Sequence, residues 1–226
     1  MKTKGLVLDS RSYKGTVMPP LALEDDSRFG NDGVFTNVTW VRLPSGLWVM
    51  SFNGATSIVN CGSNISLSSY VMGVFSFESW VYANSDGEIN AGRVFHKEPG
   101  YLLALINETG AGCLLETLVD LSITDAHFLS STRLTVGAWH YLVMVYNRLG
   151  TKYVEVYLDG EATAGAATQG VGTLIDDTAA VLCLGNRVAG DRTFDGEISM
   201  PRIYSYALTP AQIYAHFQAE RRLFGR

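Results

Sequence analysis

The chain has little charge, and that shortage already excludes some classes of protein. Charged residues make up 17% of its 226 positions, and Lys+Arg 17 against Asp+Glu 22 leave a formal net charge of −5. A domain that grips nucleic acid or anionic lipid usually carries a basic excess. We therefore expect no nucleic-acid partner. Hydrophobic residues make up 47% of the chain, which is too apolar for a disordered protein.

Long apolar runs are also missing. No stretch approaches the ~18 apolar residues that indicate a membrane-spanning helix, so no membrane insertion is expected. Near the N-terminus the apolar run covers only residues 6–8, whereas a signal peptide needs about 7–15 apolar residues. The sequence thus predicts a protein made in the cytoplasm, with no signal peptide and no transmembrane segment.

Cysteine is scarce, and the three thiols have no useful spacing. Cys61, Cys113 and Cys183 are an odd number with no CxxC pair. A disulfide framework or a zinc site would need pairs or quartets. We therefore expect three buried thiols that pack as small apolar side chains.

What the sequence does contain is a series of short β-prone runs broken by Gly, Asn, Asp and Ser. In the run 74–82, Phe75 and Phe77 alternate with Glu78 and Trp80, which predicts a strand with two different faces. Such short runs with regular turn residues indicate an antiparallel sandwich or barrel. Further strands are predicted at 47–52, 100–106, 114–118, 181–184 and 202–204.

Two local patterns are stronger than the rest. Residues 140–146 and 152–158 predict a hairpin, and Asp159-Gly160 directly after it is a strong turn signal. Helical periodicity is convincing only near the C-terminus. There Thr209 is predicted to be the N-cap and Pro210 the first helical position. Residues 211–217 then carry an apolar stripe.

Several segments together resemble a known family. Their sequences include a Gly-Asn-x-Gly loop, a strand ending in Phe-Asn-Gly, a Phe-Ser-x-x-x-Trp-Val strand, a Trp-His … Leu-Asp-Gly hairpin and a C-terminal Arg-Ile-Tyr-x-x-Ala-Leu-Thr; they lie at 25–33, 47–54, 75–81, 139–161 and 194–209. In this order they resemble the laminin G-like domains of the concanavalin A-like lectin/glucanase superfamily. The resemblance implies an all-β fold, an antiparallel two-sheet jelly-roll β-sandwich with one short C-terminal helix.

The resemblance also divides the chain and shows one departure. We expect an N-terminal arm at 1–20, the jelly-roll domain at 21–218 and a basic C-terminal tail at 219–226. Pro201 stands where the family usually has valine. Because proline cannot donate a ladder hydrogen bond, its strand should lie at an edge or carry a bulge.

No catalytic set is visible on this predicted scaffold. Glucanases of the superfamily carry Glu-x-Asp-x-x-Glu on one strand, and glycoside hydrolysis needs two carboxylates. The nearest approach here joins Glu155, Asp159 and Glu161, whose spacing is wrong. The four histidines are scattered, and His140 is interpreted as structural. The sequence therefore predicts a protein that is not an enzyme.

Calcium is the better-founded cofactor prediction. Ca²⁺ prefers about 6–8 oxygen ligands from carboxylates and carbonyls. In the resembling family, the Gly-Asn-x-Gly loop can meet the late strand around a Ca²⁺ ion. That correspondence gives Asp26 and Asn31 on one side and Asp195 and Glu197 on the other. Ser199 replaces a frequent acid, which weakens the site. The alternative is an Asx-turn whose side chains bond their own backbone.

Aromatic residues invite a sugar-platform interpretation. Trp80 and Trp139 match core positions of the resembling family and are expected to be buried, whereas Trp40 follows polar residues and is expected to be the most exposed tryptophan. No set of carbohydrate-binding residues can be assigned from these positions.

Two functions remain open at this point. The first is a structural or docking component of an assembly, for example a decoration or tail protein of a phage or virus particle. It is favoured by a chain that starts at its own Met1 without an export signal, and the arm and tail would then make the inter-subunit contacts of a self-associating protein. The alternative is a carbohydrate-binding, lectin-like recognition or adhesion module assisted by Ca²⁺.

Overall fold

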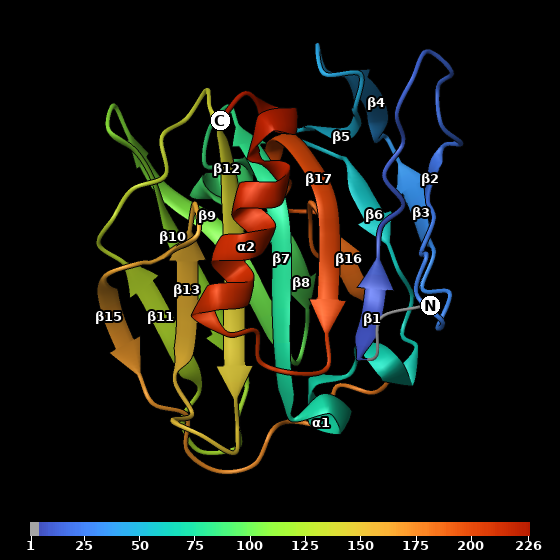
Figure 1. The fold of residues 1–226 in the computed structure, drawn as a ribbon. Coiled ribbons are helices and arrows are strands. Elements are labelled where there is room, and N and C mark those ends of the chain that lie inside the picture. The colour runs from blue at the N-terminus through green and yellow to red at the C-terminus, as the bar shows by residue number, and fades with distance from the viewer. Residues whose placement is uncertain (1–4) are drawn as a thin grey trace.

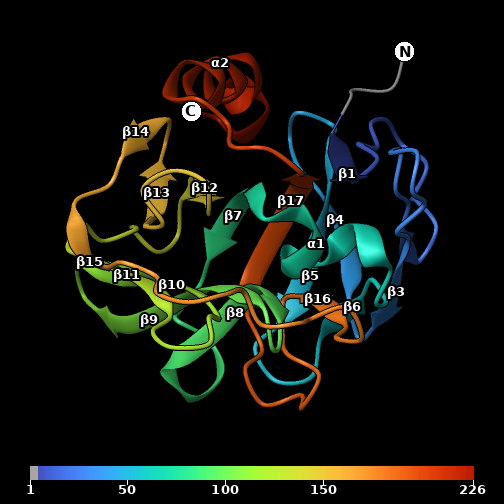
Figure 2. The ribbon, with the colours of Figure 1, turned by 90° about the horizontal axis from the view of Figure 1, so that it is seen from below.

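Two antiparallel sheets face each other across one hydrophobic core, as a computed structural model describing residues 5–226 shows (Figures 1 and 2). The eight-stranded sheet runs β14-β13-β12-β7-β17-β5-β4, with β1 on the second half of β17. Its strands are β1 (Leu6–Asp9), β4 (Thr39–Arg42), β5 (Trp48–Asn53), β7 (Val74–Ala83), β12 (Trp139–Asn147), β13 (Val154–Leu158), β14 (Glu161–Ala162) and β17 (Asp195–Tyr204). The predicted jelly-roll sandwich is confirmed.

The nine-stranded sheet forms the second layer. It runs β15-β11-β10-β9-β8-β16-β6-β3-β2. Its strands are β2 (Ala22–Leu23), β3 (Gly33–Thr36), β6 (Ile58–Asn60), β8 (Ala91–Lys97), β9 (Tyr101–Thr109), β10 (Gly112–Val119), β11 (Ala126–Ser130), β15 (Gly165–Thr168) and β16 (Leu182–Leu184). The helical segments are η1 (Ile65–Leu67), α1 (Ser69–Met72), η2 (Glu88–Asn90), α2 (Pro210–Glu220) and η3 (Arg221–Phe224).

Strand β7 lies at the centre of the eight-stranded sheet and has the predicted two faces. Phe75 and Phe77 point into the core between the sheets. Trp80 lies on the opposite, outer face and belongs to a second apolar cluster. That outer face is also covered, because α2 packs across it (Figure 2). The sequence of a strand that is buried on both faces is mostly apolar. Glu78 is an exception in β7, because it is a carboxylate with no exposed surface.

Helix α2 begins where the sequence predicts. The Thr209 side chain accepts from the Gln212 backbone, and the Gln212 side chain accepts from the Thr209 backbone, which completes a capping box with Pro210 at the first turn. Ile213 and Phe217 are the buried residues of the helix and pack on the sheet. The helix is thus a third layer over the eight-stranded sheet.

Both ends of the described chain belong to the sandwich. Within the predicted arm, residues 6–9 form β1, and Leu8 is fully buried; residues 1–4 lie outside the described part. Within the predicted tail, residues 219–220 end α2, and Phe224 stacks on Trp80 with ring centroids 4.3 Å apart. Arg226 forms an ion pair with Asp159. These residues make contacts inside the domain rather than forming a separate arm and tail.

The predicted irregularity at Pro201 is present. The pairing of β17 with β7 shifts register between Ser199 and Arg202, and Met200 has a φ of 50°. Strand β17 lies between β7 and β5, so it is not an edge strand. The proline is tolerated because the bulge takes it out of the regular ladder.

The burial of the tryptophan and cysteine side chains can be compared with the predictions from the sequence. Trp80 and Trp139 are buried, and all three cysteines are buried and free, as expected. Trp40 is only half-exposed. Its indole N–H donates to the Pro20 carbonyl, and its ring packs against Phe35 and Tyr13. The polar residues before Trp40 therefore do not leave it as an open platform.

Candidate functional site

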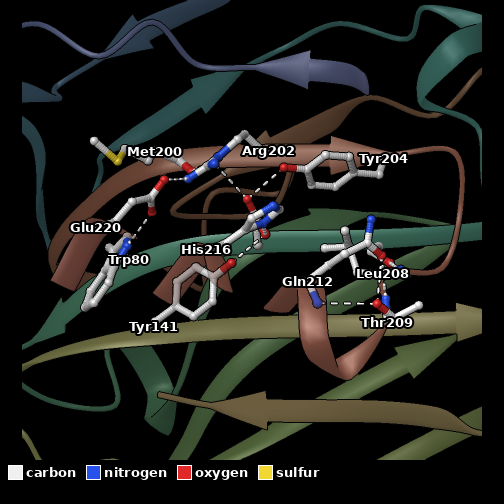
Figure 3. Close-up of polar contacts among 12 residues, drawn as sticks. Trp80, Tyr141, Met200, Arg202, Tyr204, Leu208, Thr209, Gln212, His216 and Glu220 are labelled. Atoms are coloured by element: carbon white, nitrogen blue, oxygen red, sulfur yellow. Dashed lines mark hydrogen bonds and ion pairs between the residues drawn. The ribbon is translucent and has the colours of Figure 1, made fainter. Parts of the chain in front are cut away.

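A buried cluster of charged and phenolic groups surrounds the Glu78 carboxylate under α2. The Tyr204 hydroxyl lies 2.8 Å from Oε1 and the Arg202 guanidinium 3.0 Å from it. The Tyr141 hydroxyl donates to Oε2, and Nδ1 of His216 lies 2.9 Å from the same atom. Figure 3 shows these four side chains converging from two strands and the helix.

The cluster continues to the end of α2. Glu220 accepts from Arg202 on one oxygen and from the Trp80 indole N–H, at 2.8 Å, on the other (Figure 3). Each carboxylate oxygen of Glu78 and Glu220 therefore has a donor. A buried charge is tolerated when it is paired and its hydrogen bonds are made.

The electrostatics of this cluster keep Glu78 ionised. Burial acts to raise the pKa of Glu78, but Arg202 and the hydrogen bond to His216 outweigh it, so that its pKa lies below the ordinary value. The hydrogen bond to Glu78 raises the pKa of His216. Both shifts favour a charged pair. Since every group is already engaged within the protein, the cluster is suited to holding α2 on the sheet.

A second group of side chains, three of them polar and two aromatic, lies on the same face, beyond the helix. Directly paired residues on adjacent strands point to the same side of a sheet. Successive pairings run from β12 across β7, β17 and β5 to β4, and they join Trp139, Tyr82, Glu197, Ser51 and Thr39. We call these five residues the Glu197 row. Four strand spacings of ~4.8 Å make it about 19 Å long.

Glu197 is the charged member of the row and differs from Glu78 in its surroundings. Its side chain is half-buried, and within residues 5–226 its carboxylate forms no hydrogen bond or ion pair. Burial, with a contribution from the Asp195 charge, raises the pKa of Glu197. A partly desolvated carboxylate without a partner is free to accept hydrogen bonds from a ligand.

Its neighbour Asp195 is not free in this way. Oδ1 of Asp195 accepts from the Asn84 amide at 3.1 Å, and Oδ2 accepts from the Ser85 hydroxyl at 2.8 Å. These bonds hold the loop after β7 against the start of β17. Asp195 is therefore already engaged within the fold, whereas Glu197 has no partner among the described residues.

An apolar hollow adjoins the row at Trp139. It has a volume of about 450 Å³ and lies between the β4–β5 turn and the C-terminal segment. Trp139 lies 5.8 Å from Tyr82, measured between ring centroids. The aromatic end of the row thus opens onto a hollow lined by Leu43, Pro44, Trp139, Arg222, Phe224 and Gly225.

The structure does not bring the four predicted calcium ligands together. The N–H of Asp26 donates to the Asp9 carbonyl, and Asp9 pairs with Arg202 near the end of β17. Asp195 is seven residues earlier on that strand, or about 23 Å away at ~3.3 Å per residue. A single ion cannot be shared across this distance. Among residues 5–226, no group of three or more His, Cys, Asp or Glu side chains could hold a metal.

The loop that carries Asp26 and Asn31 is organised by Asp25. The Asp25 carboxylate accepts from the backbone N–H groups of Asp9, Ser27 and Asn31 at 2.7–2.8 Å. Asp26 pairs with Arg11, and the Asn31 amide donates to the Val7 carbonyl. This arrangement matches the alternative of an Asx-turn. Calcium as a cofactor of this chain stays a prediction.

Sequence reasoning placed Glu197 in a site but missed its neighbours. Tyr82 ends the alternating run in which Trp80 was assigned to the outer face, so its orientation follows from the same alternation. Ser51 and Thr39 could not be found, because their position opposite Glu197 depends on strand pairing.

This architecture defines a lectin-like jelly-roll sandwich with an open polar row on one face. The family model described as the concanavalin A-like lectin/glucanases superfamily, of laminin G type, matches residues 53–214. The chain belongs to this family, and the predicted resemblance is confirmed.

Solved structures with the same fold include domain 4 of AbnA, a GH43 extracellular arabinanase from Geobacillus stearothermophilus, in complex with arabinotriose. It is 19% identical over 94% of this chain and 98% of that domain, with a TM-score of 0.64. The binding domain of Paraclostridial Mosquitocidal Protein 1 is 15% identical, with a TM-score of 0.71. The alignment covers 98% of this chain and 55% of that binding domain.

The binding domain of botulinum neurotoxin DC, in complex with SialylT, is 12% identical over 96% of this chain, with a TM-score of 0.65. The chain spans about half the length of these toxin binding domains. At such identities the likeness shows the fold alone. No curated protein sequence matches the chain. Within residues 5–226, no helix is long and apolar enough to cross a bilayer.

Proposed function

We propose that this chain is a non-catalytic carbohydrate-recognition module that binds a glycan along the Glu197 row. The observation that carries the proposal is the half-buried Glu197 carboxylate, which has no partner among the described residues and lies between Tyr82 and Ser51. Two solved domains of similar fold, one in complex with arabinotriose and one with SialylT, support a binding role.

The chemistry of the row fits a sugar. A pyranose or furanose ring has an apolar C–H face and an edge of hydroxyl groups. Tyr82 offers an aromatic face and a hydroxyl, which suits one apolar and one polar contact. The Glu197 carboxylate can accept from two sugar hydroxyls, while Ser51 and Thr39 can donate or accept. The row is long enough for several sugar units.

The same geometry supports binding without hydrolysis. Glycoside hydrolysis requires two available carboxylates on opposite sides of the scissile bond. Glu197 has no partner among the described residues, but each oxygen of Asp195 already accepts a hydrogen bond, from Asn84 or Ser85, that holds it against the loop after β7. The proposal therefore includes no bond cleavage.

A glycan array followed by titration of the best oligosaccharide tests the proposal, with arabinotriose included as a defined probe. Glu197→Gln should weaken binding about 10- to 100-fold, since hydrogen bonds to a charged group contribute about 1.5–3 kcal/mol. The matched control is Glu155→Gln, at an exposed side chain on β13 of the same sheet and well outside the row.

Three results would contradict the proposal. They are an array without any binding, equal loss in both variants, and release of new reducing ends from a bound oligosaccharide. A role as a decoration or tail component of a virus particle stays a prediction, which needs the mass and partners of the protein in solution.

A further inference from the structure

The Glu197 row carries negative charge that no basic side chain of the described residues balances. Glu197 forms no ion pair within residues 5–226, and the two hydrogen bonds of Asp195 come from the neutral Asn84 amide and Ser85 hydroxyl. The two carboxylates are two positions apart on β17, on the same face of the sheet and about 7 Å apart at ~3.3 Å per residue. The row therefore presents two neighbouring charges of the same sign.

The cluster around Glu78 shows how the chain balances such a charge elsewhere on this face. The Arg202 guanidinium lies 3.0 Å from the Glu78 carboxylate, and Nδ1 of His216 lies 2.9 Å from it. The Glu197 row has no basic member. A partly desolvated carboxylate is stabilised by a positive charge close to it. In the row, that positive charge has to come from the ligand.

The aromatic residues of the row suit a cation as well as a sugar ring. Tyr82 pairs directly with Glu197 on the adjacent strand, which places their Cβ atoms about 5 Å apart. Trp139 follows Tyr82 at 5.8 Å between ring centroids. The face of an aromatic ring attracts an ammonium group within about 6 Å of its centroid. A cation beside Glu197 can therefore contact a carboxylate and an aromatic ring together.

The charges around the row act in the same direction. The formal net charge of −5 attracts cations and repels anions. Arg222 lines the hollow at Trp139, but the neighbouring charge that shifts the pKa of Glu197 is that of Asp195, which raises it. Arg222 therefore does not neutralise Glu197. An acidic sugar at this position would meet two carboxylates, whereas a basic sugar would be held by them.

We propose that the sugar unit opposite Glu197 is an amino sugar with a free, protonated amine, so that the row selects cationic glycans over neutral and acidic ones. The ammonium group donates to the Glu197 carboxylate and lies against the Tyr82 ring. The hydroxyl groups of the glycan contact Ser51 and Thr39. This inference rests on the proposed carbohydrate recognition and names the class of its ligand.

Titration calorimetry of the full chain with three extended trisaccharides tests the inference. The trimers of glucosamine, N-acetylglucosamine and glucose share a β-1,4 linkage and differ only at C2, which carries an ammonium, an acetamide or a hydroxyl group. At a pH where the amine is protonated and Glu197 is ionised, the glucosamine trimer should bind about five- to tenfold more tightly than the other two, through one partly desolvated ion pair. Added salt should reduce this difference.

Two variants show whether the preference arises at the row. Glu197→Gln should remove it and leave three similar affinities. Glu155→Gln makes the same change in net charge at an exposed side chain outside the row and should keep the preference. The inference is overturned by a glucosamine trimer that binds no more tightly than the neutral trimers or not at all, and by a preference that survives in Glu197→Gln.

These failures are distinct from a failure of the proposed function. If a neutral or acidic glycan from the array binds most tightly, and Glu197→Gln still weakens its binding, recognition along the row stands and only the ligand class is wrong. If the array shows no glycan bound, including the glucosamine oligomers, both are overturned.

Discussion

Two glutamates on the outer face of one sheet differ in what surrounds them. Glu78 is fully buried, and its two oxygens contact Tyr141, Arg202, Tyr204 and His216. Glu197 is half-buried and has no partner in residues 5–226. The opposite directions of their pKa shifts report the same difference. A carboxylate whose bonds are all made within the fold stabilises it, whereas one left open at a cost in stability is available for a ligand.

The largest expected effect comes from removing the closed carboxylate. Glu78→Ala should lower the free energy of unfolding by about 3–5 kcal/mol, because Arg202 and its neighbours are left buried without their counter-charge. Urea denaturation measures this value. The comparison fails if Glu78→Ala costs no more than Glu197→Ala.

A second prediction concerns the apolar part of the same closed region. Phe224 stacks on Trp80 and contacts Trp139, with centroid distances of 4.3 and 4.7 Å. Phe224→Ala should cost about 3 kcal/mol, the low end for a buried phenylalanine, since a chain end can close over the space. Thermal and urea melting give the value. The neighbouring control is Leu223→Ala, at a half-buried residue that packs on the same apolar cluster but forms no ring stack. Equal costs would show that the stack with Trp80 contributes little.

The closed cluster around Glu78 should also make the stability of the protein depend on pH. The lowered pKa of Glu78 contributes stability that is present above its unfolded value near 4.5 and is lost as pH falls through the folded pKa. The raised pKa of His216 contributes stability that is complete below 6.5 and is lost as pH rises through the folded pKa. Both contributions are therefore complete between pH 4.5 and 6.5.

His216→Gln should remove the decline on the alkaline side of that window. It should weaken the acid side only in part, because Arg202 still lowers the pKa of Glu78 after the contribution of His216 is lost. Urea midpoints of both proteins from acid to alkaline pH measure this difference. A native alkaline decline that is unchanged in the variant would show that another group causes it. The expected change is smaller than for Glu78→Ala, because the three other partners of Glu78 remain.

Much of the arrangement around Glu78 follows from the local sequence. The rest depends on which strands and helices pack together. Alternation in residues 74–82 assigns Phe77 to one face and Glu78 to the other, and Thr209-Pro210 marks the start of α2. The sequence does not reveal that α2 then covers Glu78, so a buried charge looks like a solvated one. Likewise, residues 6–9 look like a terminal arm until pairing with β17 shows them to be a strand.

The candidate site shows the same limit. Glu197 was selected as a metal ligand from its position in a family motif, but its neighbours across the sheet are Tyr82 and Ser51. Asp26 and Asn31 lie near the other end of β17. Only the register of the strands decides which of these groups can meet one ligand, and a one-residue slip would turn each strand's side chains to the other face.

The smallest expected effect is that of Glu197→Gln on the stability of the protein. Its sign is opposite to that of Glu78→Ala. Because the pKa of Glu197 is raised, folding favours its protonated form, and the ionised side chain costs stability as pH rises through 4.5 toward the folded pKa. Glu197→Gln keeps the shape without the charge. At neutral pH it should therefore unfold at a slightly higher urea concentration than the native chain, while below pH 4.5 the two should coincide. A variant less stable than the native chain at neutral pH would mean that Glu197 is bonded within the fold after all, and the contrast with Glu78 would no longer hold.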